Sequence, residues 1–384
     1  NAAHWVKEYD PSRIVHYEGG SHPDSGRAND RSCIDIVSYM YMPLPDIRRY
    51  FEGNPVLPLV LCEYIHAMGN STGDAEDYRE LIERYPGFCG GFVWEWCGHA
   101  VELRRDENGR PCYGYGGDFG ELLHDGNFCV DGLVSPDRTP HTSLLEYKNV
   151  IRPVRAAWAD DTHTAVRLHN YLDFLSLDQV LAGEYEWSLN GVVIQRGAFD
   201  LPAVPPHGEG TIPCPACPPL PDGDVRLRLI WRQKSAQGLI PAGLECGFDQ
   251  LVLRREIPAA VPLRGGDVRI TESAEGVMVT GPSFAYTLDK RTGLFGEMRR
   301  AGVPLLCRPM EWNIWRAPLD NDQGIRKEWE QAGYDRAVPR AYGTTAAVEN
   351  GLAVLRTRLM LGAAARQRIL DIDACWTVDA AGIV

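Results

Sequence analysis

The spacing of hydrophobic residues changes along the 384-residue chain and divides it into three parts. Over residues 1–150, short apolar runs alternate with stretches of helical spacing. From 151 to 257, apolar and polar residues alternate with a period of two, which is typical of half-buried β-strands. A linker rich in Pro and Gly follows at 258–266, and residues 267–384 again show the strand period.

Four apolar runs in the first part predict β-strands. The runs are almost continuous, as in parallel strands that are buried on both faces. A segment with helical spacing at Tyr78, Leu81 and Ile82 lies between the last two runs, and the order strand–helix–strand predicts a parallel sheet. The runs are RIVHYEG (13–19), IDIVSYMY (34–41), PLVLCEY (58–64) and GGFVWEW (90–96), and the helix is DAEDYRELIERY (74–85).

Side chains that can do chemistry stand where these strands end. They are Glu18, Tyr41, Glu63, Trp94 and Glu95. A (β/α)8 barrel places its active site at the carboxyl ends of its strands. Since only four strands are predicted, we expect half of such a barrel.

The second and third parts predict antiparallel sheets. Val225, Leu227, Leu229 and Trp231 alternate with polar positions, and Asn190-Gly191 between two apolar runs is a strong hairpin signal. Residues 202–223 predict a long loop. The fold class is therefore multidomain α/β plus all-β: the C-terminal half of a barrel, an immunoglobulin-like β-sandwich, and the first part of a large antiparallel β domain. We interpret the sequence as truncated at both ends.

Composition excludes several classes of protein. Hydrophobic residues make up 44% and charged residues 24%, as in soluble globular proteins. The net charge of −13 argues against nucleic acid, because phosphate binding requires a basic surface, and also against anionic membranes. No apolar run approaches the roughly 20 residues that span a bilayer. We expect a cytoplasmic protein with no membrane partner.

The eleven cysteines show no disulfide spacing, which favours a reducing compartment. Cys62, Cys89 and Cys97 are predicted to be small buried hydrophobic residues. The pair Cys214 and Cys217 is interpreted as part of an irregular loop, since a zinc site would need further ligands.

Glu63 is the strongest catalytic candidate. Retaining glycosidases use one carboxylate as nucleophile and a second, about 5–5.5 Å away, as acid and base. Position alone leaves two interpretations open, a nucleophile at a barrel mouth or a strand-end Glu in a salt bridge.

The segment around Glu63 resembles the nucleophile segment of the LacZ-type β-galactosidases of glycoside hydrolase family 2. It reads LCEYIHAMGNS over residues 61–71. Further matches cover essentially the whole chain and are weakest over the sandwich: DPSRIVHYEGG (10–20), IDIVSYMY, GGFVWEW, YGGDFGE (115–121), NFCVDGL (127–133), DRTPH (137–141) and RAPLDND (316–322).

The resemblance assigns roles by position. Glu63 corresponds to the nucleophile that forms the covalent galactosyl-enzyme, and Tyr41 to a tyrosine beside it. His66 corresponds to a histidine that hydrogen-bonds the galactosyl ring, and Trp94 to a platform under its apolar face. Without the family, a strand-end core Tyr, a loop His and a barrel-core Trp would be the ordinary interpretations. Met68 and Asn70 would shape the loop.

Two metal ions are also implied. Phe128 and Asp131 match a segment that helps to hold sodium at the sugar 6-hydroxyl, where Phe128 also contacts substrate. Asp131 replaces an Asn of the family, which adds a charge, although hard cations accept carboxylate oxygens. The remaining sodium ligand and most magnesium ligands would lie upstream of this chain.

The acid/base Glu of the family lies in an Asn-Glu-Ser-Gly-type segment that this sequence lacks. Nothing in the sequence marks Glu18 or Glu95 as protonated near pH 7, Asp118 is a further weak substitute, and His99 and His124 remain unassigned. We expect a retaining β-galactosidase, acting on β-galactosides such as lactose, whose isolated fragment is nearly inactive.

The resemblance further implies partners: the missing N-terminal region of the same protein, and other copies of it in a homo-oligomer. Two alternatives stay open. One is a family 2 glycosidase of the β-glucuronidase or β-mannosidase type, and the other is a non-catalytic sugar-binding scaffold.

Overall fold

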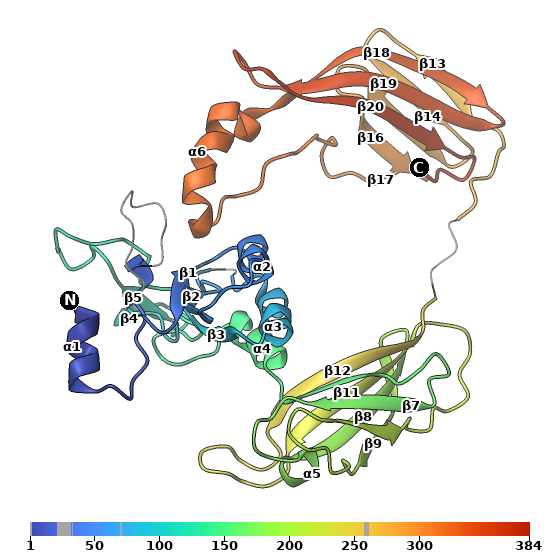
Figure 1. Ribbon diagram of the computed structural model, residues 1–384. Helices are drawn as coiled ribbons and strands as arrows, with labels where there is room; N and C mark the ends of the chain where they lie inside the picture. The colour runs from blue at the N-terminus through green and yellow to red at the C-terminus, as the bar shows by residue number, and fades with distance from the viewer. Residues whose placement is uncertain (1, 21–31, 33, 70, 257–260) are drawn as a thin grey trace. The chain divides into compact units, whose positions relative to one another are not determined.

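A computed structural model describes residues 2–20, 32, 34–69, 71–256 and 261–384 (Figure 1). The chain forms two compact units, Asn1–Ile257 and Pro258–Val384. Asn1, Asn70 and positions 258–260 of the expected linker lie outside the described residues.

The first part of unit 1 is built around a three-stranded parallel sheet of order β1-β2-β3. Helices α2, α3 and α4 pack on one side of this sheet (Figure 1), where Ile47, Leu81 and Val150 join its buried residues. The elements are α1 (Ala2–Tyr9), η1 (Glu18–Gly20), β1 (Val37–Met40), α2 (Leu44–Glu52), β2 (Leu59–Tyr64), α3 (Ala75–Arg84), β3 (Phe88–Val93), the hairpin β4 (Val101–Arg105) and β5 (Pro111–Gly114), and α4 (Thr142–Val150).

One of the four predicted strands, at 13–19, is wrong. Only Val15 of this segment is buried, while Ile14 and Tyr17 are about two-thirds exposed. The N–H of Val15 donates to the side chain of Asp35 at 2.7 Å instead of to a neighbouring strand. The segment therefore runs as an extended loop into η1, and the described sheet has three parallel strands rather than four.

The second part of unit 1 is a β-sandwich. Its sheets have the orders β10-β7-β6 and β12-β11-β8-β9. The core between them contains Trp187, Leu227, Leu229 and Trp231 from alternate positions of the strands, as the period of two predicts. The elements are β6 (Val154–Trp158), β7 (Ala165–Asn170), α5 (Leu177–Val180), β8 (Leu181–Leu189), β9 (Val192–Phe199), β10 (Glu209–Pro213), β11 (Val225–Gln233) and β12 (Glu245–Arg254).

The predicted hairpin at Asn190-Gly191 is confirmed: it joins β8 to β9, and both turn residues have positive φ, +49° and +81°. The predicted loop 202–223 is wrong in part, because β10 lies within it and pairs with β7.

Unit 2 consists of two antiparallel sheets with the orders β13-β14-β15-β16-β17 and β18-β19-β20. Tyr286 and Phe295 of the first sheet share a core with Leu355 and Val378 of the second. The elements are β13 (Arg269–Glu272), β14 (Gly276–Thr280), β15 (Phe284–Asp289), β16 (Leu294–Arg300), β17 (Val303–Pro304), η3 (Asp320–Asp322), α6 (Gln323–Ala332), η4 (Tyr334–Arg336), β18 (Val338–Glu349), β19 (Leu352–Gly362) and β20 (Arg368–Val378).

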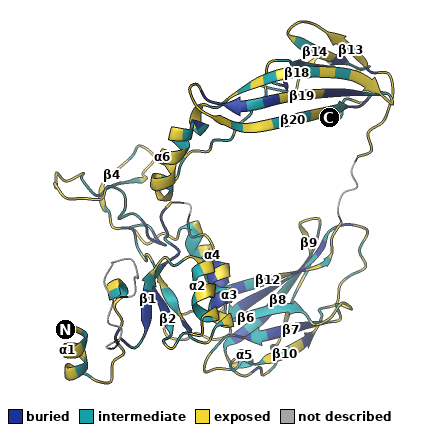
Figure 2. Cartoon of the chain, turned by 45° about the horizontal axis from the view of Figure 1, so that its top comes forward, coloured by how far each residue is buried: buried dark blue, intermediate teal, exposed yellow. Residues whose placement is uncertain are grey.

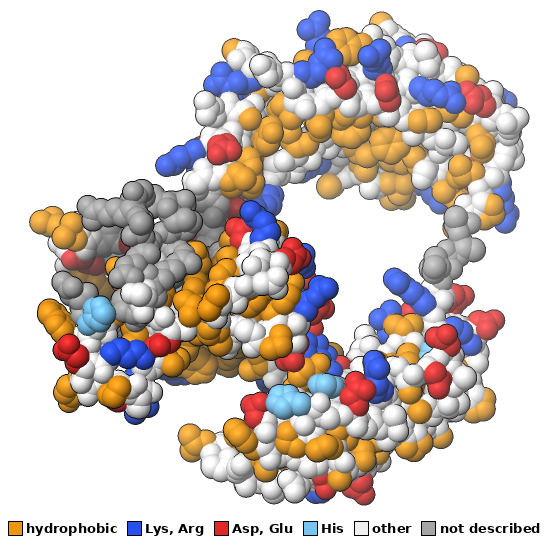
Figure 3. Space-filling view, viewed as in Figure 1, with side chains coloured by type: hydrophobic (Ala, Val, Ile, Leu, Met, Phe, Trp, Pro, Cys, Tyr) orange, Lys and Arg blue, Asp and Glu red, His pale blue; other side chains and the backbone are white. Residues whose placement is uncertain are grey.

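Burial follows the sheets, with buried positions concentrated on β1, β2 and the inward faces of the sandwich strands (Figure 2). Acidic and basic side chains are intermixed over the outer faces of α2 and α3 (Figure 3), which is typical of solvated helices. Cys89 is exposed rather than buried, and Cys62 and Cys97 are half-buried. Among the described residues every cysteine is a free thiol, including Cys214 and Cys217.

Candidate active site

Glu63 and Tyr41 lie side by side where β2 and β1 end. The parallel register pairs Met40 with Glu63, and the N–H of Tyr41 donates to the main-chain oxygen of Glu63 at 2.9 Å. The Tyr41 hydroxyl lies close enough to the Glu63 carboxylate for the two groups to interact. Burial, together with this carboxylate, raises the pKa of Tyr41, so its hydroxyl keeps its proton at neutral pH.

Asp131 is the buried acceptor that joins two further predicted residues. One oxygen of its carboxylate, Oδ2, lies 3.1 Å from Nε2 of His66 and accepts the Trp94 indole N–H at 3.1 Å. The Asp131 side chain is only 2% exposed. A single carboxylate therefore fixes the orientation of a ring from the loop after β2 and of one from the end of β3.

Ring contacts extend this group. His66 packs edge-on against Tyr41, with ring centroids 5.8 Å apart, and stacks on Phe128 at 6.1 Å. Trp94 is 40% exposed and Tyr41 38%, so both present ring surface to solvent. Five of the six predicted side chains therefore form one group. They are Tyr41, His66, Trp94, Phe128 and Asp131. Tyr41 connects the sixth, Glu63, to this group.

Main-chain hydrogen bonds tie the loops that carry these side chains. The N–H of Ala67 donates to Trp94 O at 2.8 Å, and the N–H of Glu95 donates to Asp131 O at 3.0 Å. The N–H of Leu133 donates to Glu95 O at 2.8 Å. Three segments distant in sequence therefore form one connected rim.

Glu95 differs from the sequence-based expectation that nothing marks it as protonated. Burial, followed by the neighbouring Asp131 carboxylate, raises its pKa to about 7. His99 lies on its other side, with Nε2 3.4 Å from a Glu95 oxygen. The sequence places Glu95 beside Trp94, but its pKa is raised by burial and by the proximity of Asp131, 36 residues downstream, and both require the fold.

The other weak candidates, Asp118, Glu18 and His124, take part in local turns and a short helix. Asp118 is exposed and accepts the N–H of Tyr115 at 2.9 Å, and Glu18 lies in the short helix η1. His124 accepts the N–H of Gly126 at 3.2 Å. None of these contacts involves the group around Glu63. Met68 is buried, as a loop-shaping residue requires, whereas Asn70 lies outside the described residues.

Asp131 also offers an oxygen to a cation. Its second carboxylate oxygen, Oδ1, is buried and accepts no hydrogen bond from the described residues, apart from what a protonated Glu95 can donate. Such an oxygen suits a hard cation. Across the described ranges, no three His, Cys, Asp or Glu side chains gather in a way that could hold a metal.

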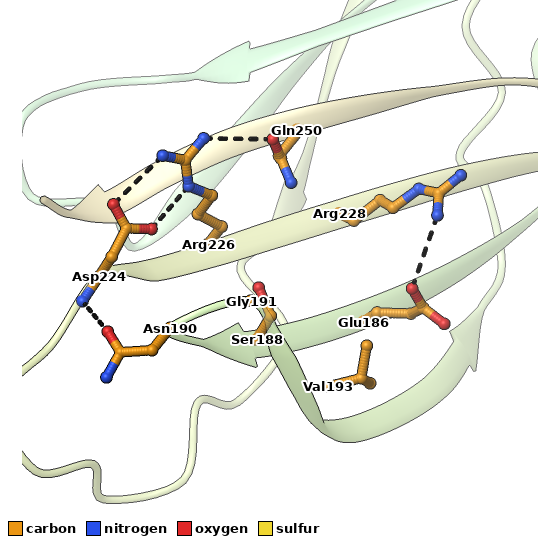
Figure 4. Close-up of a pocket in the computed structure, with 9 residues that line it drawn as sticks. All are labelled: Glu186, Ser188, Asn190, Gly191, Val193, Asp224, Arg226, Arg228 and Gln250. Carbon is orange, nitrogen blue, oxygen red and sulfur yellow. Dashed lines mark hydrogen bonds and ion pairs between the residues drawn. The ribbon is translucent and has the colours of Figure 1, made fainter. Parts of the chain in front are cut away.

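A polar pocket of about 420 Å³ lies on the sandwich. Figure 4 shows that its charged groups pair with one another: Arg226 binds Asp224 and Gln250, and Arg228 faces Glu186. Because these groups satisfy each other, we interpret the pocket as a network of surface ion pairs rather than a reaction site.

Three family models match consecutive stretches of the chain. Residues 1–156 match "Glycosyl hydrolases family 2, TIM barrel domain", residues 166–254 match "Beta-galactosidase, domain 4", and residues 280–384 match "Beta galactosidase small chain". The predicted fold class is confirmed by these matches together with the mostly β structure.

Known proteins resemble the chain over most of its length. A β-galactosidase of Actinobacillus pleuropneumoniae is 43% identical over 97% of this chain, and one of Staphylococcus xylosus is 35% identical over 88%. The chain spans about a third of their length, 36% and 34% respectively. A solved exo-chitosanase of Amycolatopsis orientalis, 9% identical, aligns over 62% of this chain and 21% of its own, with a TM-score of 0.21. No helix among the described residues has the length and apolarity to cross a bilayer.

Proposed function

The chain belongs to glycoside hydrolase family 2, and from this premise we propose that the protein is a retaining β-galactosidase with Glu63 as its nucleophile. The observation that carries the proposal is the position of Glu63 beside Tyr41 at the strand ends, where the Tyr41 N–H donates to Glu63 O at 2.9 Å, next to the group formed by His66, Trp94 and Asp131. A carboxylate with a hydroxyl donor and a neighbouring aromatic ring suits attack on a sugar.

In the proposed reaction, an oxygen of Glu63 attacks the anomeric carbon and displaces the aglycone. Water then cleaves the glycosyl ester, which regenerates the carboxylate. Tyr41 would hold Glu63 in place through a hydrogen bond from its hydroxyl, which stays protonated because the pKa of Tyr41 is raised. Tyr41 is therefore a positioning donor to the nucleophile throughout the cycle.

The sugar would bind against the rings that Asp131 orients. Trp94 presents its exposed ring surface to the apolar face of galactose, and His66 hydrogen-bonds a ring hydroxyl while Phe128 packs behind it. Because Asp131 accepts from both His66 and Trp94, it would fix the relative position of these two contacts.

We propose that a sodium ion binds at Asp131 Oδ1 and the main chain of Phe128 when Glu95 is ionised and leaves this buried oxygen without a donor. Bound there, the ion would supply a positive charge for a sugar hydroxyl. Most ligands of a magnesium ion would come from the part of the protein upstream of this chain, as the resemblance implies.

The acid and base would come from a part of the protein outside these 384 residues, since the Asn-Glu-Ser-Gly-type segment is absent from them. We further propose the division 1–150, 151–257, 258–266 and 267–384, assembly as a homo-oligomer, and a cytoplasmic location. Lactose and similar β-galactosides are the proposed substrates.

Trapping of the intermediate tests the proposal. A 2-deoxy-2-fluoro-β-galactoside with a dinitrophenyl leaving group should label the complete protein, and peptide mass mapping should place the label on Glu63. Glu63→Gln should lose both labelling and turnover of nitrophenyl β-galactoside. A label on another residue would overturn the assignment, and a faster turnover of the glucuronide or mannoside would overturn the substrate.

A further inference from the structure

The segment RAPLDND, which the proposed reaction does not use, borders an aromatic pocket in unit 2. The pocket has a volume of about 470 Å³ and is lined by Asn313, Ile314, Trp315, Arg316, Trp329 and Tyr334. Small-molecule sites typically measure about 300–1,000 Å³ and combine aromatic walls with a few polar groups. We propose that this pocket binds a neutral saccharide, as a second sugar site besides the one at Glu63.

Two indole rings form adjoining walls of the pocket. The centroids of Trp315 and Trp329 are 6.1 Å apart and their planes meet at 82°. Neither ring is fully buried. A pyranose has one apolar face and a rim of hydroxyls, so one indole can cover the face while the other borders the rim.

The indole N–H groups of Trp315 and Trp329 are open to a ligand at a pocket wall, whereas the unbonded indole N–H of Trp187 is buried in the sandwich core. Neither Trp315 nor Trp329 donates a hydrogen bond from its indole to another described residue, so both donors remain for a ligand hydroxyl. Five other tryptophans use their indole N–H within the fold: Trp94, Trp158, Trp231, Trp312 and Trp376.

The charges around the pocket favour a neutral ligand. Arg316 lies over the Trp329 ring, 5.0 Å from its centroid, and its guanidinium donates to both oxygens of Asp322. Asp322 also accepts the N–H of Leu319 at 2.7 Å. Because the positive charge of Arg316 is matched by this carboxylate, the pair attracts neither an anion nor a cation strongly.

The helix that carries Trp329 buries none of its side chains in the core of unit 2. Helix α6 has no buried residue among its ten, and Ile325, one turn before Trp329, is 47% exposed. The helix is held at its C-terminal end instead. Gly333 follows α6 with φ +86°, and Arg366 donates to Gln331 O at 2.7 Å. A ligand between Trp315 and Trp329 would therefore add packing that the chain itself does not supply.

The inference rests on the proposed function only in the choice of probe, lactose. Titration calorimetry of the 384-residue chain carrying Trp94→Ala, which disables the sugar platform at Glu63, should still show lactose binding. Adding Trp315→Ala or Trp329→Ala should weaken that binding at least tenfold. Trp5→Ala, on the exposed helix α1, should leave it unchanged.

Trp315→Phe keeps an aromatic wall but lacks the N–H, so it should weaken lactose binding less than Trp315→Ala. This graded result would distinguish a lost ligand contact from a lost fold. Loss of all lactose binding with Trp94→Ala alone would overturn the second site. Tighter binding of galactonate than of lactose would overturn the neutral ligand. Turnover of nitrophenyl β-galactoside by the complete protein is measured separately. Failure of the proposed function can therefore be distinguished from failure of the second sugar site.

Discussion

Arg152, two residues beyond α4, donates two hydrogen bonds to the Asp249 carboxylate on β12, at 2.6 and 3.2 Å. Asp249 is 6% exposed and also accepts the Trp231 indole N–H at 2.8 Å. The ion pair thus joins the barrel part of unit 1 to the core of its sandwich. Bidentate Arg155–Glu76 contacts, at 2.6 and 2.9 Å, connect the same two parts.

Arg152→Ala should destabilise unit 1 by about 3–5 kcal/mol, because it leaves the buried Asp249 carboxylate without its counter-charge. Urea unfolding followed by tryptophan fluorescence measures the loss. The matched control is Arg196→Ala: the Arg196 side chain is 71% exposed, and its partner Glu186 keeps Arg228 nearby at 3.9 Å, so the expected cost is at most about 1 kcal/mol. Equal effects of the two variants would contradict the role given to Arg152.

Glu95 should make the stability of unit 1 depend on pH. Its pKa of about 7 in the folded chain exceeds the ordinary 4.5, so the folded state binds this proton more tightly than the unfolded state. The resulting stabilisation is complete below pH 4.5 and is lost as the pH rises through about 7. Unfolding measured in sodium-free buffer should therefore show a falling free energy over this window.

Glu95→Gln should remove that slope, whereas Glu107→Gln, in the exposed turn between β4 and β5, should leave it intact. An unchanged slope in Glu95→Gln would assign the titration to another group. Asp131→Asn should shift the midpoint to lower pH, because the negative neighbour that helps to raise the pKa of Glu95 is gone.

Tyr41→Phe should lower kcat of the complete protein on nitrophenyl β-galactoside about 100-fold, since single donors aimed at reacting carboxyl or oxyanion groups contribute roughly this much. Tyr9→Phe, at a side chain that is 93% exposed, serves as the control. A Tyr41→Phe enzyme with unchanged kcat would show that a hydrogen bond from Tyr41 to Glu63 has no part in the rate.

Sodium should stabilise the chain through Asp131. In sodium chloride, the thermal midpoint should exceed that in choline chloride at equal ionic strength, because an ion that binds only the folded state adds stability by mass action. Asp131→Ala removes the oxygen ligand and should abolish the difference, while Asp131→Asn keeps an oxygen and should reduce it. A full sodium effect in Asp131→Ala would place the ion elsewhere.

Gly191→Ala should destabilise the sandwich by about 1–2 kcal/mol, because φ at this turn position is +81° and a Cβ is strained there. Gly324→Ala provides the opposite case: this glycine lies within α6, and an added Cβ meets no atom within 4 Å. Alanine favours helix there by up to about 1 kcal/mol. Loss of stability in both variants would contradict the conformational explanation.

The sequence predicts the strands and turns where one local signal suffices. Asn190-Gly191 and the alternation along β11 predict their elements correctly because each depends only on neighbouring residues. The strand expected at 13–19 fails, because pairing depends on a partner strand, and Asp35 occupies the Val15 N–H instead. Likewise β10 escapes prediction, since its Pro- and Gly-rich sequence becomes a strand only through pairing with β7.

The candidate site shows the same limit. Family resemblance predicts Glu63, Tyr41, His66, Trp94, Phe128 and Asp131 as its members, but not that Asp131 bonds both His66 and Trp94. The raised pKa of Glu95 also depends on burial and on a carboxylate distant in sequence. The bonds of Asp131 and the raised pKa of Glu95 depend on how the side chains pack, so residue types alone do not predict them.

The main-chain bonds from Ala67 to Trp94 and from Glu95 to Asp131 have a consequence for how the protein can vary. Each bond fixes a backbone atom rather than a side chain, so side chains on this rim can be exchanged while the spacing of the loops cannot. Insertions or deletions between residues 63 and 67, or between 127 and 133, should be poorly tolerated. Those at the exposed turn 106–109, between β4 and β5, should be accepted.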